Sequence, residues 1–123
     1  IINSVRANYD ISHFSLKVVE YFLKNKKILN DYILQINKSK KYIAKECLKR
    51  KLKFLNTKAN FFHIFLKPKK IKEVFEFLRK NKILIRSRYF GDLNLLNNSI
   101  RVTIGSKKQM SYFFKQFDKV YFN

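Results

Sequence analysis

Two arginines in the second half of the chain have the residue type and the setting to bind an anion. Arg86 closes the apolar run 83–85, and Arg101 opens the alternating run 100–104. A guanidinium stays charged at any working pH, and its planar fork of N–H donors matches a carboxylate or a phosphate bidentately. Each arginine is expected where a strand meets a loop, which is a common place for binding groups. For either arginine alone, a solvated charge at a strand end is the alternative.

Helical spacing of apolar residues predicts two helices in the first half of the chain. Ser12 is a good N-cap for a helix at about 11–24, and a polar break is expected at 25–29. A longer helix of roughly 20 residues should begin near Asn30. The residues expected on the apolar stripes of these two helices are Leu16, Val19, Leu23, Ile33, Ile36, Ile43 and Cys47.

The second half of the chain is expected to alternate strands and helices. The almost unbroken apolar run at 60–66 predicts a central strand covered on both faces, and Pro68 is placed to begin the next helix. There follow a strand at 83–86, a loop at 87–98 with Arg88 and Tyr89, a strand at 99–105 and a final helix. Gly105 marks the turn into that helix, which needs either a positive φ or a close approach to the backbone.

Both helices of the second half carry apolar residues at positions i, i+3, i+4 and i+7. They are Ile71, Val74, Phe75 and Leu78 in one helix, and Met110, Phe113, Phe114 and Phe117 in the other. Such stripes face a core. The order of elements predicts an α+β fold, in which helices cover a small, mostly antiparallel sheet.

Four segments, in their order along the chain, resemble a known enzyme family. They are Arg6-Ala7-Asn8-Tyr9-Asp10-Ile11-Ser12, Asn60-Phe61-Phe62, Ile83-Leu84-Ile85-Arg86 and Ile100-Arg101-Val102-Thr103-Ile104-Gly105. This order resembles the C-terminal small domain of fold-type I pyridoxal-phosphate aminotransferases, and within them the histidinol-phosphate aminotransferase group. The segment 100–105 is the most specific of the four. The first segment departs from the family's R-x-P-Y-N-[VI]-S pattern at Asn8 and Asp10, which leaves the subfamily open.

The resemblance implies that residues 1–12 are a linker from a large domain and that residues 13–123 form the aminotransferase small domain. It implies that Arg101 binds the α-carboxylate of an amino-acid or amino-phosphate substrate, and that Arg86 lies near the substrate's second polar or anionic group. In the family the large domain holds the cofactor, pyridoxal 5'-phosphate, and its Schiff-base lysine lies upstream of the linker. The chain alone is therefore expected to be inactive and to contain no catalytic, cofactor-binding or metal-binding residue. The complete enzyme is expected to be a homodimer and to act in amino-acid biosynthesis.

Three other residues or pairs have structural interpretations. Ser39-Lys40 contains a Ser-Lys pair, but it lies inside a helical pattern and lacks the Ala-Gly-rich run that follows the family's lysine. His63 is expected to be a packing residue, because no second His or Cys offers metal-ligand spacing. Cys47 is expected to be a buried packing thiol.

The charge of the chain raises a rival hypothesis. The 28 Lys and Arg against 8 Asp and Glu give a net charge of +20, which is typical of nucleic-acid-binding modules. The basic residues are dispersed, however, and the aromatic residues follow core periodicity, whereas a dedicated surface gathers cations on one face with exposed aromatics. A nucleic-acid-binding module is thus the disfavoured alternative, and a non-catalytic domain derived from the transferase is another. No apolar run approaches the roughly 18 residues of a membrane span, so we expect a cytoplasmic protein with no membrane partner.

Overall fold

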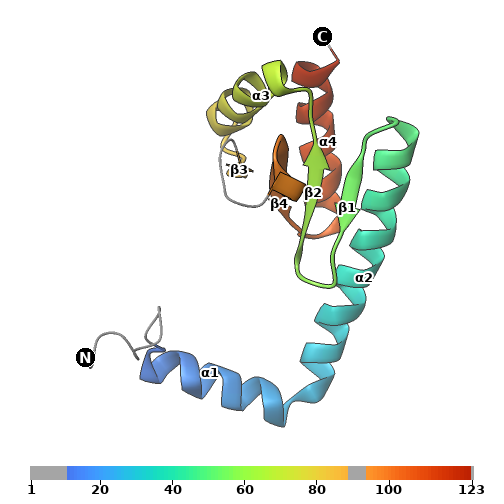
Figure 1. The fold of residues 1–123 in the computed structure, drawn as a ribbon. Helices are drawn as coiled ribbons and strands as arrows, with labels where there is room; N and C mark the ends of the chain where they lie inside the picture. The colour runs from blue at the N-terminus through green and yellow to red at the C-terminus, as the bar shows by residue number, and fades with distance from the viewer. Residues whose placement is uncertain (1–10, 89–93, 123) are drawn as a thin grey trace, which may run out of the picture. The chain divides into compact units, whose positions relative to one another are not determined.

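The computed structural model describes residues 11–88 and 94–122, which form an α+β fold as predicted (Figure 1). The chain divides into an N-terminal unit that ends at Leu34 and a second unit, Gln35–Asn123. The helices are α1 (His13–Lys24), α2 (Lys26–Lys49), α3 (Pro68–Lys80) and α4 (Lys107–Tyr121), with a short 3-10 turn η2 (Asn94–Leu96). The strands are β1 (Phe54–Asn56), β2 (Phe61–Phe65), β3 (Arg86–Arg88) and β4 (Ser99–Thr103).

The first two helices are separated by a single residue. Ser12 caps α1 as predicted, because its Oγ accepts a hydrogen bond from the Ser15 N–H at 3.1 Å. The expected polar break at 25–29 is wrong, since α2 already begins at Lys26. Asn25 alone ends α1, with its backbone N–H and its side-chain amide both donating to the Tyr21 carbonyl. The residues that follow, Lys-Lys-Ile-Leu, are acceptable or good helix formers and extend α2 towards the N-terminus.

The apolar stripe of α1 exists but is not buried within the N-terminal unit. Leu16, Val19 and Leu23 are 51%, 52% and 60% exposed, and α1 contains no buried residue. A unit this small cannot enclose a core of its own, so the predicted spacing gives a helix whose apolar stripe is exposed within the unit. In α2, Ile43 and Cys47 are buried, as predicted for the Cys47 thiol, whereas Ile36 is partly buried and Ile33 is 46% exposed.

The second unit contains a four-stranded, fully antiparallel sheet in the order β1-β2-β4-β3 (Figure 1). β2 is central, as its apolar run predicted, and pairs with β1 on one side and β4 on the other. β1 was not expected from the sequence. A strand of three residues with one partly buried position carries too short a pattern to be recognised without its partner.

The segment 83–85 follows the end of α3 and is not a strand, so the expected strand at 83–86 is misplaced. Lys82 has a φ of 60°, and the Ile83 N–H donates to the Leu78 carbonyl at 2.9 Å. The Lys82 N–H donates to the Arg79 carbonyl, which completes a Schellman motif at the end of α3. Pairing begins only at Arg86, so Arg86 opens β3 instead of closing a strand.

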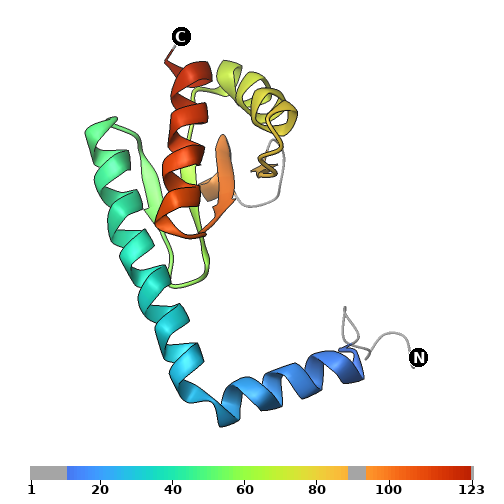
Figure 2. The same cartoon turned by 180° about the vertical axis from the view of Figure 1, so that it is seen from behind.

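One face of the sheet packs on helices and forms the core. Phe62, Ile64, Ile100 and Val102 are at most 4% exposed and belong to a single apolar cluster with the stripes of α3 and α4. Figure 2 shows α4 lying across this face. The predicted stripe residues are buried in both helices, with Phe75 partly buried. Successive residues of a strand point to opposite faces, so Phe61, His63, Arg101 and Thr103 project from the other side.

Candidate anion-binding site on the sheet

Three chemically active side chains share one row across the sheet. His63 on β2 is paired with Arg101 on β4, and Arg101 is paired with Arg86 on β3. Residues directly opposite each other on neighbouring strands point to the same face. The two arginines that the sequence singled out are therefore neighbours, although 14 positions lie between them in the chain.

Arg101 lies in the middle of β4, so the expectation that it stands where a strand meets a loop is wrong. Its side chain is partly buried, and its guanidinium carbon lies 5.0 Å from the centre of the Phe61 ring. Such a cation–π contact supports a guanidinium through its flat face and leaves the N–H edge available. Phe61 thus acts as a platform for Arg101. The sequence analysis did not assign this role, which depends on the offset between two strands.

Arg86 is exposed at the first position of β3. Within residues 11–88 and 94–122, neither Arg86 nor Arg101 forms an ion pair with a carboxylate. Opposed residues of an antiparallel pair have Cβ atoms about 4.5–5.5 Å apart, and like charges there are destabilising. A bound carboxylate or phosphate between the two guanidinium groups would remove that repulsion and would fit the bidentate geometry that each offers.

His63 is a packing residue, as predicted. It is 3% exposed, and its Nδ1 lies 3.0 Å from the Ser99 Oγ. Because Ser99 donates its hydroxyl proton to the Leu96 carbonyl at 2.7 Å, Nδ1 must carry the proton of the His63 contact. His63 thereby ties β2 to the start of β4 beside Arg101. Among the described residues no cluster of three or more His, Cys, Asp or Glu could hold a metal ion.

The Ser39-Lys40 pair has a structural role in the fold. The Lys40 Nζ donates to the carbonyls of Thr57 and Lys58, at 3.0 and 3.1 Å, and so fixes the turn between β1 and β2 to α2. Ser39 is buried beside it. Cys47 is fully buried, and burial raises the pKa of its thiol to about 12, which makes it a poor nucleophile.

Some expectations fall on parts of the chain outside the described residues. Tyr89 and most of the linker 1–12 lie there, and the position of the Arg88 side chain is likewise outside them. The expected contribution of the loop 87–98 to a substrate pocket therefore stays a prediction.

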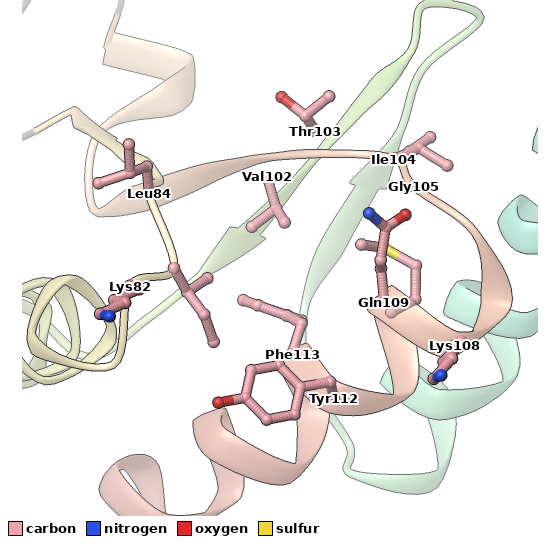
Figure 3. Close-up of a pocket in the computed structure, with 12 residues that line it drawn as sticks. Lys82, Leu84, Val102, Thr103, Ile104, Gly105, Lys108, Gln109, Tyr112 and Phe113 are labelled. Carbon is pink, nitrogen blue, oxygen red and sulfur yellow. The ribbon is translucent and has the colours of Figure 1, made fainter.

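An apolar pocket of about 560 Å³ lies at the C-terminal end of β4 (Figure 3). Its walls come from the segment after α3, from β4 and from α4, and none of Arg86, Arg101, Phe61 or His63 lines it. Shape alone would favour this pocket as the binding site. For an anionic ligand the arginine row is the better candidate, because charge and bidentate geometry converge there.

Gly105, at the edge of this pocket, packs closely against the Gln109 side chain. No described glycine has a positive φ, and a Cβ on Gly105 would lie 2.5 Å from the Gln109 Oε1. That oxygen accepts a hydrogen bond from the Ser106 N–H at 2.8 Å, while Ser106 Oγ accepts from the Gln109 N–H. The two form a capping box that starts α4, so close approach, and not backbone conformation, accounts for the glycine.

Comparison with known proteins shows which enzymes this sequence is similar to. The chain is 30% identical to a histidinol-phosphate aminotransferase of Campylobacter jejuni over 124 aligned positions, which cover 98% of the chain and 33% of that relative. The chain is similar to histidinol-phosphate aminotransferases over about a third of their length. Enzymes of the same name from Clostridium botulinum and Carboxydothermus hydrogenoformans are 27% and 26% identical over 92% and 97% of the chain. No family model matches the chain.

The chain spans about a third of the length of these aminotransferases, 31% to 33%. The predicted resemblance to this group is therefore confirmed by the matches, which extend over nearly the whole chain. No helix among the described residues is long and apolar enough to cross a membrane.

Proposed function

We propose that this chain is the C-terminal small domain of a pyridoxal-phosphate-dependent aminotransferase of the histidinol-phosphate type, with residues 1–12 as the linker from the large domain. Arg101 binds the anionic group of the substrate, which is the α-carboxylate where the substrate is an amino acid. Arg86 binds a second anionic or polar group. The observation that carries this proposal is the direct pairing of the two arginines on the face of the sheet opposite the apolar core, with no carboxylate partner among the described residues.

The geometry around Arg101 suits a positioning group. Phe61 holds one face of the guanidinium, so the direction of its N–H edge is restricted before a ligand arrives. A side chain fixed in advance loses less entropy when it binds a carboxylate. Arg86 adds a second charge from the neighbouring strand, which favours substrates with two anionic centres, such as amino-phosphates and amino dicarboxylates.

The exposed apolar surface of the N-terminal unit supports a role within a larger protein. Twelve large apolar side chains between Ile11 and Leu34 are 37% to 77% exposed. So many exposed apolar side chains in one short segment normally mark a contact with another protein or domain. In the proposed enzyme, the large domain and the second subunit of the homodimer cover it.

The cofactor supplies the carbanion chemistry of transamination, and in this proposal the large domain holds it. The lysine that binds pyridoxal 5'-phosphate in the family is expected in the large domain, outside this chain. Lys40 is unsuited to that role because two backbone carbonyls already occupy its amine. The task of these residues is to fix the substrate so that its reacting bond faces the cofactor.

The proposal is tested on the protein at its natural length, purified with pyridoxal 5'-phosphate. Histidinol phosphate, an aromatic amino acid and a primary amine without an anionic group are added separately, and transfer of the amino group is followed by the change in cofactor absorbance. We expect transfer from the anionic donors and none from the amine that lacks an anionic group. A protein that binds the cofactor but accepts no anionic donor would contradict the proposal, as would one that does not bind the cofactor.

A further inference from the structure

A second cavity, which we call the basic pocket, lies where the end of α2, the start of α3 and the end of α4 meet. Figures 1 and 2 both show the start of α3 beside the end of α4. The basic pocket has a volume of about 630 Å³, and its lining contains no Asp or Glu. Its charged lining residues are Arg50, Lys51, Lys53, Lys67 and Lys70. Arg86 and Arg101 do not line it, so it is separate from the arginine row.

Two of the five cations have carboxylate partners. Arg50 binds Asp118 through Nε at 2.6 Å and Glu46 through Nη1 at 2.5 Å, and Lys70 lies 3.0 Å from Glu73. The other three, Lys51, Lys53 and Lys67, form no ion pair within the described part of the chain. Ammonium groups gathered around one cavity repel each other, and an anion with two or more charges would relieve that repulsion.

The start of α3 adds positive potential at the same place. Its N-cap residue, Lys67, makes no side-chain capping hydrogen bond, and its first turn contains no acidic residue. Pro68 has no N–H, and the Lys70 N–H already donates to the Lys67 carbonyl at 2.9 Å. The helix start therefore leaves the Lys69 N–H and the positive end of the helix dipole available to an anion. Lys67 and Lys70 flank this start and also line the pocket, so phosphate is the anion that best matches the arrangement.

Two aromatic residues, Tyr121 and Phe122, also line the basic pocket. Tyr121 is stacked on the buried Phe117, with ring centres 5.1 Å apart and planes inclined by 24°, so the Tyr121 ring is held in place. Phe122 meets Tyr121 edge to face at 5.1 Å and is 53% exposed. An exposed aromatic ring next to phosphate-binding groups offers a surface on which a nucleobase stacks.

We propose that the basic pocket binds a free nucleoside phosphate. The phosphates lie at Lys51, Lys67 and the start of α3, and the base stacks on Phe122. Arg50 shapes the pocket wall but does not bind the ligand, because its guanidinium is already occupied by Asp118 and Glu46.

The test is titration calorimetry on the protein at its natural length, saturated with pyridoxal 5'-phosphate. The probes are ATP, AMP, adenosine, inorganic phosphate and a short single-stranded oligouridylate, each at low and at physiological salt. We expect ATP to bind more tightly than AMP. The dissociation constants of both should be at least about tenfold lower than those of adenosine and of inorganic phosphate. The affinity for ATP should fall as salt is raised.

Two variants and a control identify the site. The double variant Lys51→Gln with Lys67→Gln should weaken ATP binding about tenfold or more. Lys72→Gln with Lys115→Gln removes the same charge from exposed positions outside the pocket, and should change ATP binding less than about twofold. Phe122→Leu should weaken AMP about fivefold and leave inorganic phosphate unchanged.

Three results would overturn the proposal. Equal losses in the pocket and control double variants would show that net charge alone attracts the ligand. If inorganic phosphate binds as tightly as ATP, the pocket recognises phosphate alone and not a nucleoside phosphate. Binding of the oligouridylate without binding of ATP or AMP would assign the pocket to single-stranded nucleic acid instead of a free nucleotide.

Discussion

Arg86 and Arg101 face each other directly across β3 and β4, with no carboxylate partner among the described residues. Two like charges so placed raise the free energy of the folded state when no ligand is bound. They also form a site in which an anion gains from both groups at once. Stability and binding are therefore expected to oppose each other at this pair.

Arg86→Gln is expected to raise the stability of the ligand-free protein and to weaken its binding of an anion. Removing one guanidinium is expected to raise the free energy of unfolding of the ligand-free protein by about 0.2–1 kcal/mol. Sulfate should then stabilise the variant less than it stabilises the natural protein, because one of its two ligands is gone. Urea unfolding with and without sulfate measures both effects. Arg79→Gln, at an exposed position of α3, is the control, and an equal sulfate response in both variants would disprove the paired site.

The ion pair between Arg50 and Asp118 should contribute measurably to stability. It joins the end of α2 to the end of α4 by two hydrogen bonds of 2.6 and 2.7 Å, and the Arg50 guanidinium carbon lies 4.7 Å from the centre of the Phe114 ring. Asp118→Asn is expected to cost about 1–2 kcal/mol, a value reduced from that of a buried pair because the Asp118 side chain is 38% exposed.

The exposed pair of Lys70 and Glu73 provides the comparison for Asp118→Asn. Glu73→Gln should cost at most about 0.5 kcal/mol, since that pair is solvated. The urea midpoints of the two variants, measured at one salt concentration, show which ion pair contributes more to stability. If both variants lose the same stability, the Arg50 ion pair has no special role.

Gly105→Ala is predicted to act through the N-terminus of α4. The new Cβ would displace the Gln109 amide, whose Oε1 it would approach to 2.5 Å, and would thereby open the capping box. The expected loss of stability is about 0.5–1.5 kcal/mol. Gly105→Ala should lower the stability of the Gln109→Ala variant less than it lowers the stability of the natural protein, because the capping box is already lost in that variant. Strict additivity of the two changes would contradict this explanation of the glycine.

The buried thiol of Cys47 should affect the pH dependence of stability. Burial raises its pKa to about 12, against 9.0 for a solvent-exposed thiol. Above pH 9 the unfolded chain therefore releases a proton that the folded chain keeps, so stability falls as pH rises from about 9 towards 12. Cys47→Ala lacks this proton. The difference in free energy of unfolding between the natural protein and Cys47→Ala should shrink from pH 8 to pH 10, and a constant difference would show that the thiol ionises normally.

The helices of the core could be predicted from the sequence because their pattern repeats over several turns. Met110, Phe113, Phe114 and Phe117 recur at helical spacing and are all buried in α4. The apolar run of β2 gave the central strand for the same reason. Where the local apolar pattern agrees with the tertiary packing over many residues, the sequence pattern is enough to predict the element.

The elements that build the arginine row could not be placed from the sequence. Ile83 looks like a strand residue, but the positive φ of Lys82 and the hydrogen bond to Leu78 assign it to the end of α3. That single motif moves the start of β3 to Arg86 and so determines which residue faces Arg101. Register depends on the partner strand, which a sequence pattern does not specify.

The measurement that tests the account most directly is the catalytic efficiency, kcat/KM, of Arg101→Gln with an anionic amino donor, in the protein at its natural length. We predict a loss of about 2–4 kcal/mol of transition-state binding, which is a fall of roughly 30- to 1000-fold. Arg79→Gln should remain within about twofold of the natural protein, since it removes the same charge from an exposed position far along the sequence from β4. A value of kcat/KM for Arg101→Gln that matches Arg79→Gln would contradict the assignment of Arg101 as the substrate's anion-binding residue.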